Sequence, residues 1–245
     1  MTSVTQSEVL KFARKLRVYK NTAHPMVRIG ANGDGGYVID MPIESIPYVI
    51  SLGIDQEISF DWEFAERGIN VFQYDPSIDQ PPRQHNCFLF RKLAVSHITG
   101  LNSISLNDVI LEAGESSVNG ILKFDIEGHE WLALASASSE LLSGFQTLVG
   151  EFHFFDAIEN RQYFDLFSYV LEKLSFTHTL THLHPNNGTG VVVVNGVVFP
   201  RLMELTFRRN DLGTFLPEIG LTRSCLDYPS VMTLPELLLP SFWNY

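Results

Sequence analysis

Residues 121–131 read ILKFDIEGHEW, and this stretch decides the fold. An apolar run ends abruptly in Asp125, Glu127, His129 and Glu130, with one glycine among them. A short apolar run that passes through a glycine into a helical pattern is typical of a buried strand followed by a helix. Polar groups just after such a strand lie at the sheet edge where α/β proteins bind ligands. The stretch therefore predicts a parallel strand together with a site.

Strand and helix patterns alternate on both sides of this stretch, which is typical of βαβ units and of a mostly parallel sheet. Later strand-like segments have little helix between them, so we expect them to pair antiparallel, because parallel neighbours need a long crossover. The predicted strands are 47–54, 69–75, 86–96, 120–126 and 147–155, followed by 176–187, 190–199 and 201–209. Helices are predicted near 56–68, 106–114, 129–144 and 161–175.

The segments that flank this core have their own patterns. Thr5 and Glu8 have capping-box spacing, and the apolar positions after them predict an amphipathic helix over residues 5–20. The stretch RIGANGDGGYVI, residues 28–39, predicts a glycine-rich turn, which is either a hairpin turn or a loop that closes over a ligand. We expect three parts, listed from the start of the chain: an N-terminal helix and glycine-rich cap (1–46), the core (47–210) and a C-terminal tail that packs on it (211–245).

Composition limits the function. The chain has 245 residues, 45% of them hydrophobic, and a formal net charge of −11, which argues against general binding to nucleic acid phosphates. No apolar run approaches the roughly 20 residues needed to span a bilayer. The two cysteines, Cys87 and Cys225, are too few and too far apart for a disulfide framework, so we expect a cytoplasmic protein. We expect its partner to be a small-molecule acceptor.

The first two strands of the core predict a nucleoside site. Gly53 ends the first strand, and Asp75 ends the second at the spacing typical of a carboxylate that accepts hydrogen bonds from ribose hydroxyls. The alternative is that Asp75 and Pro76 only open a turn. The loop SLGIDQEIS, residues 51–59, lacks the glycines of a dinucleotide fingerprint, so a nucleoside without phosphates fits better. S-adenosylmethionine, which carries ribose, adenine and a positive sulfonium, matches these acidic strand ends.

The acids of the opening stretch have two interpretations. Glu127 and Glu130 near the start of a helix could simply favour the helix dipole. Asp125, at the end of a strand beside the first one, could instead face the sulfonium, the amino group of the methionine moiety, a metal ion or the acceptor hydroxyl. Both interpretations stay open on these residues alone.

The chain resembles the FkbM-like methyltransferases that depend on S-adenosylmethionine. LKFDIEGHEWLAL, residues 122–134, is similar to their K-x-D-x-E-G-x-E signature, and a G-D-G-G turn upstream is typical of one subgroup. The resemblance implies a seven-stranded Rossmann-like α/β sheet, mostly parallel with an antiparallel C-terminal strand pair and helices on both faces. It also implies O-methylation, often of sugars or secondary metabolites, with Gly53, Asp75 and Asp125 holding the cofactor.

Further residues around these positions complete the predicted cofactor site. They come from the strand ends and from the glycine-rich turn: Ile54, Asp55, Pro76, Ser77, Ala94, Ile126 and Glu127, with Asp34, Gly35 and Tyr37.

Methylation of a hydroxyl needs a base, because an alcohol is a poor nucleophile until its proton leaves. We predict His153 as the base, with His129 as the second candidate and Glu151 beside His153 on the same face of its strand. A divalent metal such as Mg²⁺ could take over that role at Asp125, Glu151, His153 and His184. A metal-dependent hydrolase using the same acids and histidines, and a non-catalytic nucleoside-binding module, are the alternative functions.

Overall fold

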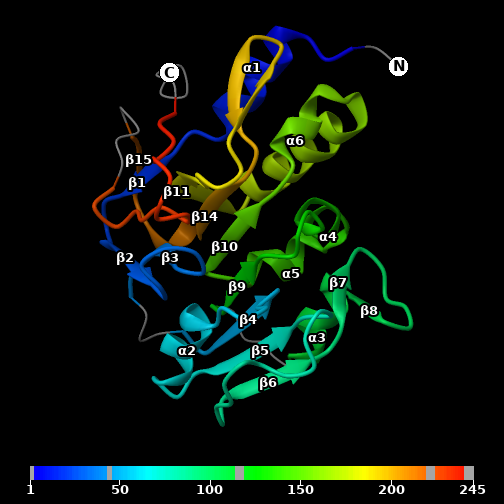
Figure 1. The fold of residues 1–245 in the computed structure, drawn as a ribbon, viewed down its shortest axis with the longest axis vertical. Coiled ribbons are helices and arrows are strands. Elements are labelled where there is room, and N and C mark those ends of the chain that lie inside the picture. The colour runs from blue at the N-terminus through cyan, green and yellow to red at the C-terminus, as the bar shows by residue number, and fades with distance from the viewer. Residues whose placement is uncertain (1–2, 43–45, 114–118, 219–223, 240–245) are drawn as a thin grey trace.

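The computed structural model describes residues 3–42, 46–113, 119–218 and 224–239. Its centre is one seven-stranded sheet (Figure 1). The spatial order of the strands is β11 (His178–Pro185), β14 (Met203–Arg209), β10 (Thr147–Phe152), β9 (Ile121–Phe124), β4 (Tyr48–Leu52), β5 (Asn70–Tyr74) and β6 (Phe88–Arg91). The strands β10, β9, β4, β5 and β6 pair in parallel, whereas β14 pairs antiparallel with both β10 and β11. The predicted fold class is therefore confirmed.

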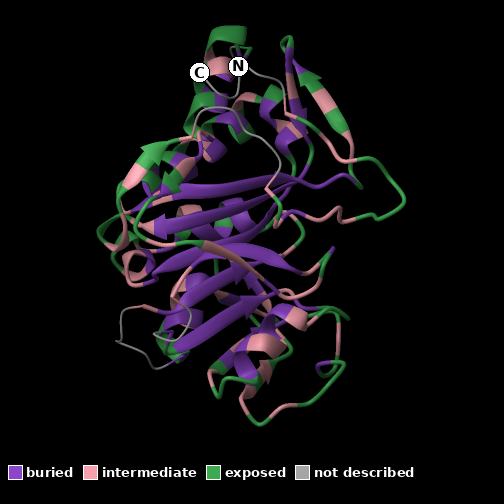
Figure 2. Cartoon of the chain, turned by 90° about the vertical axis from the view of Figure 1, so that its left-hand side faces the viewer, coloured by how far each residue is buried: buried purple, intermediate pink, exposed green. Residues whose placement is uncertain are grey.

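Two separate apolar clusters cover the two faces of the sheet. One cluster contains side chains of most of the helices, and the other contains those of α2 and of a hairpin, β2–β3. The central strands β9, β4 and β10 are buried along their whole length between these layers (Figure 2). The first face carries α1 (Gln6–Lys15), α3 (Leu106–Glu112), α4 (Glu130–Ser136), α5 (Ser139–Ser143) and α6 (Arg161–Ser175); the second carries α2 (Ser59–Ala65), β2 (Met26–Ile29) and β3 (Tyr37–Asp40). Short 3₁₀ turns, η1 (Phe155–Glu159) and η2 (Asn210–Leu212), follow β10 and β14.

The capping box predicted for the first helix is confirmed. The Thr5 side chain accepts a hydrogen bond from the Glu8 N–H, and the Glu8 carboxylate accepts one from the Thr5 N–H. The helix ends at Lys15 rather than near residue 20, because β1 (Tyr19–Asn21) pairs there with β15 (Phe215–Pro217). Pairing with a strand from the far end of the chain overrides the local helical pattern.

Two of the predicted strands differ in the structure. The segment 86–96 is interrupted after β6, and Ala94–Ser96 leaves the sheet as β7 to pair with β8 (Ser103–Ser105). The segment 190–199 is a separate hairpin of β12 (Val191–Val194) and β13 (Val197–Pro200). Its turn is Asn195-Gly196, with φ of 48° and 82°, which is the strongest short-range signal for a hairpin.

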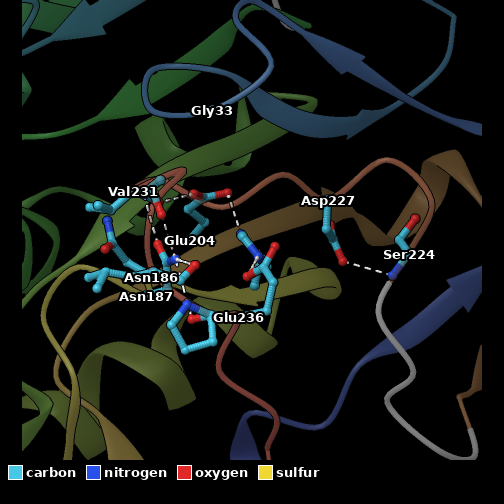
Figure 3. Close-up of polar contacts among 12 residues, drawn as sticks. Gly33, Asn186, Asn187, Glu204, Ser224, Asp227, Val231 and Glu236 are labelled. Carbon is cyan, nitrogen blue, oxygen red and sulfur yellow. Dashed lines mark hydrogen bonds and ion pairs between the residues drawn. The ribbon is translucent and has the colours of Figure 1, made fainter.

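The C-terminal strap, residues 224–239, packs across the end of β11 (Figure 3). The Asp227 carboxylate lies 2.8 Å from His182 Nε2. The Asn187 amide group donates to carbonyl groups of the strap and accepts from the Val231 N–H at 2.8 Å. The Asp227–His182 side-chain pair and the hydrogen bonds between Asn187 and the strap backbone therefore attach the strap to the sheet.

A buried lysine connects two helices. Lys173 on α6 is 8% exposed, and its ammonium donates to the carbonyl oxygens of Leu134 and Ala135 at 2.9 and 3.1 Å, and to that of Ala137. These groups lie at the end of α4, where carbonyls lack partners within the helix. We expect Lys173→Met to lower the free energy of unfolding by about 1–3 kcal/mol, because it leaves buried carbonyls unpaired.

Urea unfolding of the two proteins measures this change. The matched control is Lys15→Met, since Lys15 on α1 also reaches α6 but forms an exposed ion pair with Glu172. An exposed pair of this kind contributes only about 0–1 kcal/mol. Equal losses in the two variants would show that the buried contacts of Lys173 add nothing to stability.

Candidate active site

The ends of β4, β5 and β9 bring Gly53, Asp75 and Asp125 together at one edge of the sheet. The Gly53 N–H donates to the Tyr74 carbonyl at 2.9 Å, and the Asp125 N–H donates to the Leu52 carbonyl at 2.8 Å. These bonds continue the sheet ladder by one residue beyond the strands. The three residues that the sequence placed at neighbouring strand ends are thus neighbours in space.

The backbone geometry at position 53 requires a glycine. Its φ is 74°, and a Cβ atom at this position would lie 1.7 Å from the Asp125 carbonyl oxygen. The Lys123 ammonium donates to the Gly53 carbonyl at 2.5 Å and so ties the end of β4 to β9. The close approach of the two strand ends therefore depends on a glycine.

Asp75 accepts four hydrogen bonds. Its Oδ2 accepts from the N–H groups of Ile54 and Asp55 at 2.8 and 2.9 Å, and its Oδ1 accepts from the N–H and hydroxyl of Ser77 at 2.7 and 2.5 Å. Burial raises the pKa of Asp75, but the hydrogen bonds from Asp55, Ser77 and Ile54 outweigh it and hold the pKa below its usual value. The group is an ionised, acceptor-only carboxylate that orders the loop after Gly53.

A second group lies at the ends of β9 and β10. Ligand atoms of Asp125, Glu127 and His153 all lie within 4.8 Å of one another. Glu127 has a φ of 54°, and its Oε2 lies 3.5 Å from His153 Nε2. The Tyr37 hydroxyl, from β3, makes a long hydrogen bond of 3.5 Å to Asp125 Oδ2. Two carboxylates and one imidazole therefore converge where β9 ends.

Glu130 holds His153 from behind. Its carboxylate is fully buried and accepts from the N–H groups of Ile126 and Gly128 at 2.9 and 3.2 Å. The same oxygen lies 3.2 Å from His153 Nδ1. Trp131 donates its indole N–H to the His153 carbonyl at 2.7 Å. The imidazole is thereby oriented with Nε2 facing Glu127 and Glu151.

Burial and mutual charge shift the acid–base behaviour of this group. Burial, reinforced by the charges of Asp125 and Glu204, raises the pKa of Glu151 to about 8. Burial also raises the pKa of Asp125 to about 6, against the opposing effect of Lys123. Burial lowers the pKa of His153, but the hydrogen bond and charge of Glu130 and the other carboxylates outweigh it and raise the pKa to about 9. At pH 7 the imidazole and Glu151 are therefore both mainly protonated.

His184 lies in a different group. Its ring nitrogens are 3.3 Å from Glu204 on β14 and 3.3 Å from Glu236 on the C-terminal strap (Figure 3 labels both carboxylates). Burial lowers the pKa of His184, but Glu204, Asp227 and Glu236 outweigh it and raise the pKa to about 9. Since β14 lies between β10 and β11, Glu204 separates His184 from Glu151. The structure does not bring His184 close to Asp125, Glu127 and His153.

The remaining predicted residues are spread over several parts of the fold. Ile54, Asp55 and Ser77 contact Asp75 directly, and Ile126 and Glu127 form the turn after β9. Asp34 and Gly35 lie in the turn between β2 and β3, where a Cβ on Gly35 would collide with the Glu57 side chain. Pro76 is exposed, Ala94 lies on β7 outside the central sheet, and His129 is the exposed N-cap residue of α4.

Sequence reasoning missed three contributors to this site. They are Lys123, Glu130 and Asn186, and the last donates to Glu151 Oε1 at 3.1 Å. The K-x-D-x-E-G-x-E pattern contains Lys123 and Glu130, so it carried a signal for both. No local pattern marks Asn186, because its partner lies on β10, which is neither its own strand nor a neighbour of it.

The seven-stranded, mostly parallel sheet with its antiparallel end is a Rossmann-like α/β fold. The model of the methyltransferase FkbM domain matches residues 50–178, which is more than half of the chain. The protein belongs to the FkbM methyltransferase family. No curated protein matches the sequence significantly. In the described part of the chain, no helix combines the length and apolarity needed to cross a membrane.

Proposed function

We propose that the protein is an S-adenosylmethionine-dependent methyltransferase that acts on a hydroxyl group of a sugar or a secondary metabolite. The observation that carries this proposal is Asp75, an ionised acceptor at the end of the second parallel strand, beside the glycine turn of the first. Both polar groups of a ribose diol can donate to such a carboxylate. Membership of the FkbM family supports the transfer of a methyl group.

The residues at the strand ends fit S-adenosylmethionine in charge. The cofactor supplies a methyl group activated by the positive sulfonium. Asp75 would accept hydrogen bonds from the ribose, and Asp125 lies where a carboxylate can pair with the cationic methionine end. All four lone-pair positions of Asp75 are already used, so the ribose would replace at least one donor from Ile54, Asp55 or Ser77. We therefore expect the loop after Gly53 or the turn at Ser77 to move when the cofactor binds.

Glu151 suits the role of general base better than His153 does. At pH 7 the imidazole already carries both ring protons and has no lone pair to accept another. The pKa of Glu151 is about 8, which is close to neutral pH. A general base works best when its pKa lies near the pH at which the enzyme acts. The Asn186 amide fixes one oxygen of Glu151, and the other lies 3.8 Å from His153. Positioning of cofactor and acceptor would supply the rest of the rate.

Calorimetric titration with S-adenosylmethionine tests the cofactor assignment. We expect Asp75→Ala to weaken binding by about tenfold or more, as for the loss of a hydrogen bond to a charged group. Asp79→Asn is the matched control, because Asp79 is exposed and pairs only with exposed Lys92 in the region that the structure describes. Melting curves of each variant show whether it is folded.

The proposal is contradicted if the unchanged protein does not bind S-adenosylmethionine, if folded Asp75→Ala binds it equally well, or if the protein hydrolyses esters or phosphates with a divalent ion and no cofactor. The last would favour the hydrolase. Binding without transfer to any of a panel of sugars and hydroxylated metabolites, followed as S-adenosylhomocysteine release, would favour the nucleoside-binding module.

We also propose that Asp125, Glu127 and His153 hold a divalent ion such as Mg²⁺ or Mn²⁺. Two carboxylates and one imidazole nitrogen are a suitable donor set, and Glu130 orients the imidazole through its other nitrogen. A bound ion would lower the pKa of the acceptor hydroxyl. Glu151 and His184, named with this site from the sequence, are outside the converging group.

Metal binding should depend on pH. His153 must lose a proton to bind an ion, so we expect the affinity for Mn²⁺ to rise by up to about tenfold per pH unit until about pH 9. Calorimetry with MnCl₂ measures this, with Asp125→Asn expected to abolish binding and Asp156→Asn, a half-buried aspartate outside the converging group, as the control. Binding that is independent of pH or of Asp125 would exclude this site.

We propose a cytoplasmic location. Cys87 and Cys225 are both free thiols in the structure, which supports the cytoplasmic location expected from the sequence. The net charge of −11 supports a small-molecule partner rather than a nucleic acid.

A further inference from the structure

A pocket lies against α2. Its volume is about 470 Å³, and it opens to the surface. Three segments far apart in the sequence form it: the turn after β2, the loop that leads into α2 with the first turns of that helix, and the loop between β5 and β6. The lining side chains that matter for binding are Glu57, Ile58, Trp62, Glu63, Pro82 and Arg83.

The cation of this pocket is available to a ligand. The Arg83 guanidinium lies 3.5 Å from the centre of the Trp62 ring and is exposed. Within the described ranges it has no hydrogen bond or ion pair to the protein. A guanidinium stacked on an aromatic face keeps its in-plane N–H donors free, and they match a carboxylate or a phosphate.

The two acids of the pocket are already engaged. Glu57 Oε1 accepts from the Ser59 N–H at 2.6 Å. Glu63 Oε1 accepts from the Gly30 N–H at 3.0 Å, and its Oε2 lies 3.5 Å from Arg67. Their remaining lone pairs can accept hydrogen bonds from hydroxyl groups. The pocket thus offers a donor for an anion on one side and acceptors for hydroxyls on the other.

The Trp62 side chain is held in place by two neighbouring rings. Trp62 packs edge-on against His85 and Phe88, with ring centres 5.2 and 6.0 Å apart. The Arg83 guanidinium covers one face of the Trp62 ring, so the apolar lining that remains for a ligand consists of the rest of the indole with Ile58 and Pro82. A sugar presents both an apolar C–H face and a rim of hydroxyls, so its chemistry matches this mixture of surfaces.

We propose that this pocket binds an acidic sugar, a pyranose or furanose ring that carries a carboxylate or a phosphate. Arg83 pairs with the anion, Glu57 and Glu63 accept from ring hydroxyls, and the apolar lining contacts the ring. The inference concerns binding alone and does not depend on S-adenosylmethionine or on turnover. The turn after β2 connects the two sites, because Gly30 and Ala31 line the pocket while Tyr37 contacts Asp125.

Saturation-transfer NMR and titration with three probes test the proposal: glucuronate, glucose 6-phosphate and glucose. We expect the two anions to bind in the millimolar range or tighter, and glucose to bind more weakly. Arg83→Gln should weaken the anions by about tenfold or more, the factor for losing a charge-assisted hydrogen bond, and leave glucose unchanged. Trp62→Phe, which keeps a ring and the packing, should weaken all three probes.

The matched control is Arg201→Gln, which removes an exposed arginine paired with Asp156 and outside the pocket. The inference is overturned if neither anion binds, or if Arg83→Gln and Arg201→Gln bind the anions equally well. It is also overturned if glucose binds as tightly as both anions, because the guanidinium would then contribute nothing. Failure of S-adenosylmethionine to bind would leave these measurements unaffected, so the two proposals are tested separately.

Discussion

Glu151→Gln is expected to lower kcat by a factor of about 10²–10⁴, the usual contribution of a positioned general base. Glutamine has the shape of glutamate and keeps an oxygen that can accept from Asn186, so the fold should be retained. It cannot take a proton from the acceptor. Affinity for S-adenosylmethionine should change little, because the cofactor contacts proposed above involve Gly53, Asp75 and Asp125. Release of S-adenosylhomocysteine with a methylated acceptor measures kcat.

The pH profile of the unchanged enzyme gives the same test a second readout. The base acts only when ionised, and burial with the charges of Asp125 and Glu204 raises the pKa of Glu151 to about 8. The rate should therefore rise by about tenfold per pH unit below pH 8 and level off above it. His153 is close enough that the measured value belongs to the pair rather than to one residue.

Glu204→Gln serves as the comparison for Glu151→Gln. Glu204 is directly opposite Glu151 on β14 and is equally buried, but it pairs with His184 instead of facing Asp125. Its replacement should shift the pH profile toward lower pH, because one repelling charge is removed, and should largely preserve the maximal rate. If both variants lost activity equally, or if Glu151→Gln kept full activity, Glu151 would not be the base.

The positions of Gly53, Asp75 and Asp125 could be predicted because local sequence determines where strands end. Each of these strands ends where an apolar run gives way to a glycine or an aspartate, and parallel strands place these ends at one edge. The antiparallel end of the sheet was predictable for a similar reason, since β11 and β14 have little helix between them. The interruption between β6 and β7 was not, because it depends on pairing between β7 and β8.

The partners of the histidines could not be read from the sequence. His184 shares the predicted metal site with Glu151 and His153, and β10 and β11 follow one another along the chain with only η1 and α6 between them. In the sheet, β14 inserts between β10 and β11, and His184 pairs with Glu204 and with Glu236 of the strap. The tertiary fold determines which strand lies between β10 and β11. It therefore also determines which side chains on those strands become partners.

The partner of Glu130 could not be predicted from the local sequence either. Its place at the start of α4 explains it locally as a residue that favours the helix dipole. The structure shows a carboxylate that is buried completely and contacts His153 from β10. A local pattern can predict the position of an acid at a helix start, but only the packing of the next strand against it creates a buried ion pair.

Glu130→Ala is expected to lower the free energy of unfolding by about 3–5 kcal/mol at about pH 6, the loss typical of removing one partner of a buried ion pair. The variant leaves the N–H groups of Ile126 and Gly128 without their acceptor and the His153 imidazolium without its closest anion. Urea unfolding in the presence of a chelator measures the difference. Glu140→Ala, an exposed position on the neighbouring helix α5, should change stability by no more than about 0.5 kcal/mol.

The difference between the two proteins should depend on pH in a defined direction. The pKa of His153 is raised from 6.5 to about 9 in the folded chain. The stabilisation that this pairing provides is complete below about pH 6.5 and disappears as pH rises through about 9. Above that range Glu130 still accepts from two backbone N–H groups, so a smaller difference of about 1–3 kcal/mol should remain. A difference that is constant from pH 6 to pH 10 would mean that Glu130 does not stabilise a charged imidazole. His153 would then not be protonated at neutral pH, and the argument that favours Glu151 as the base would no longer hold.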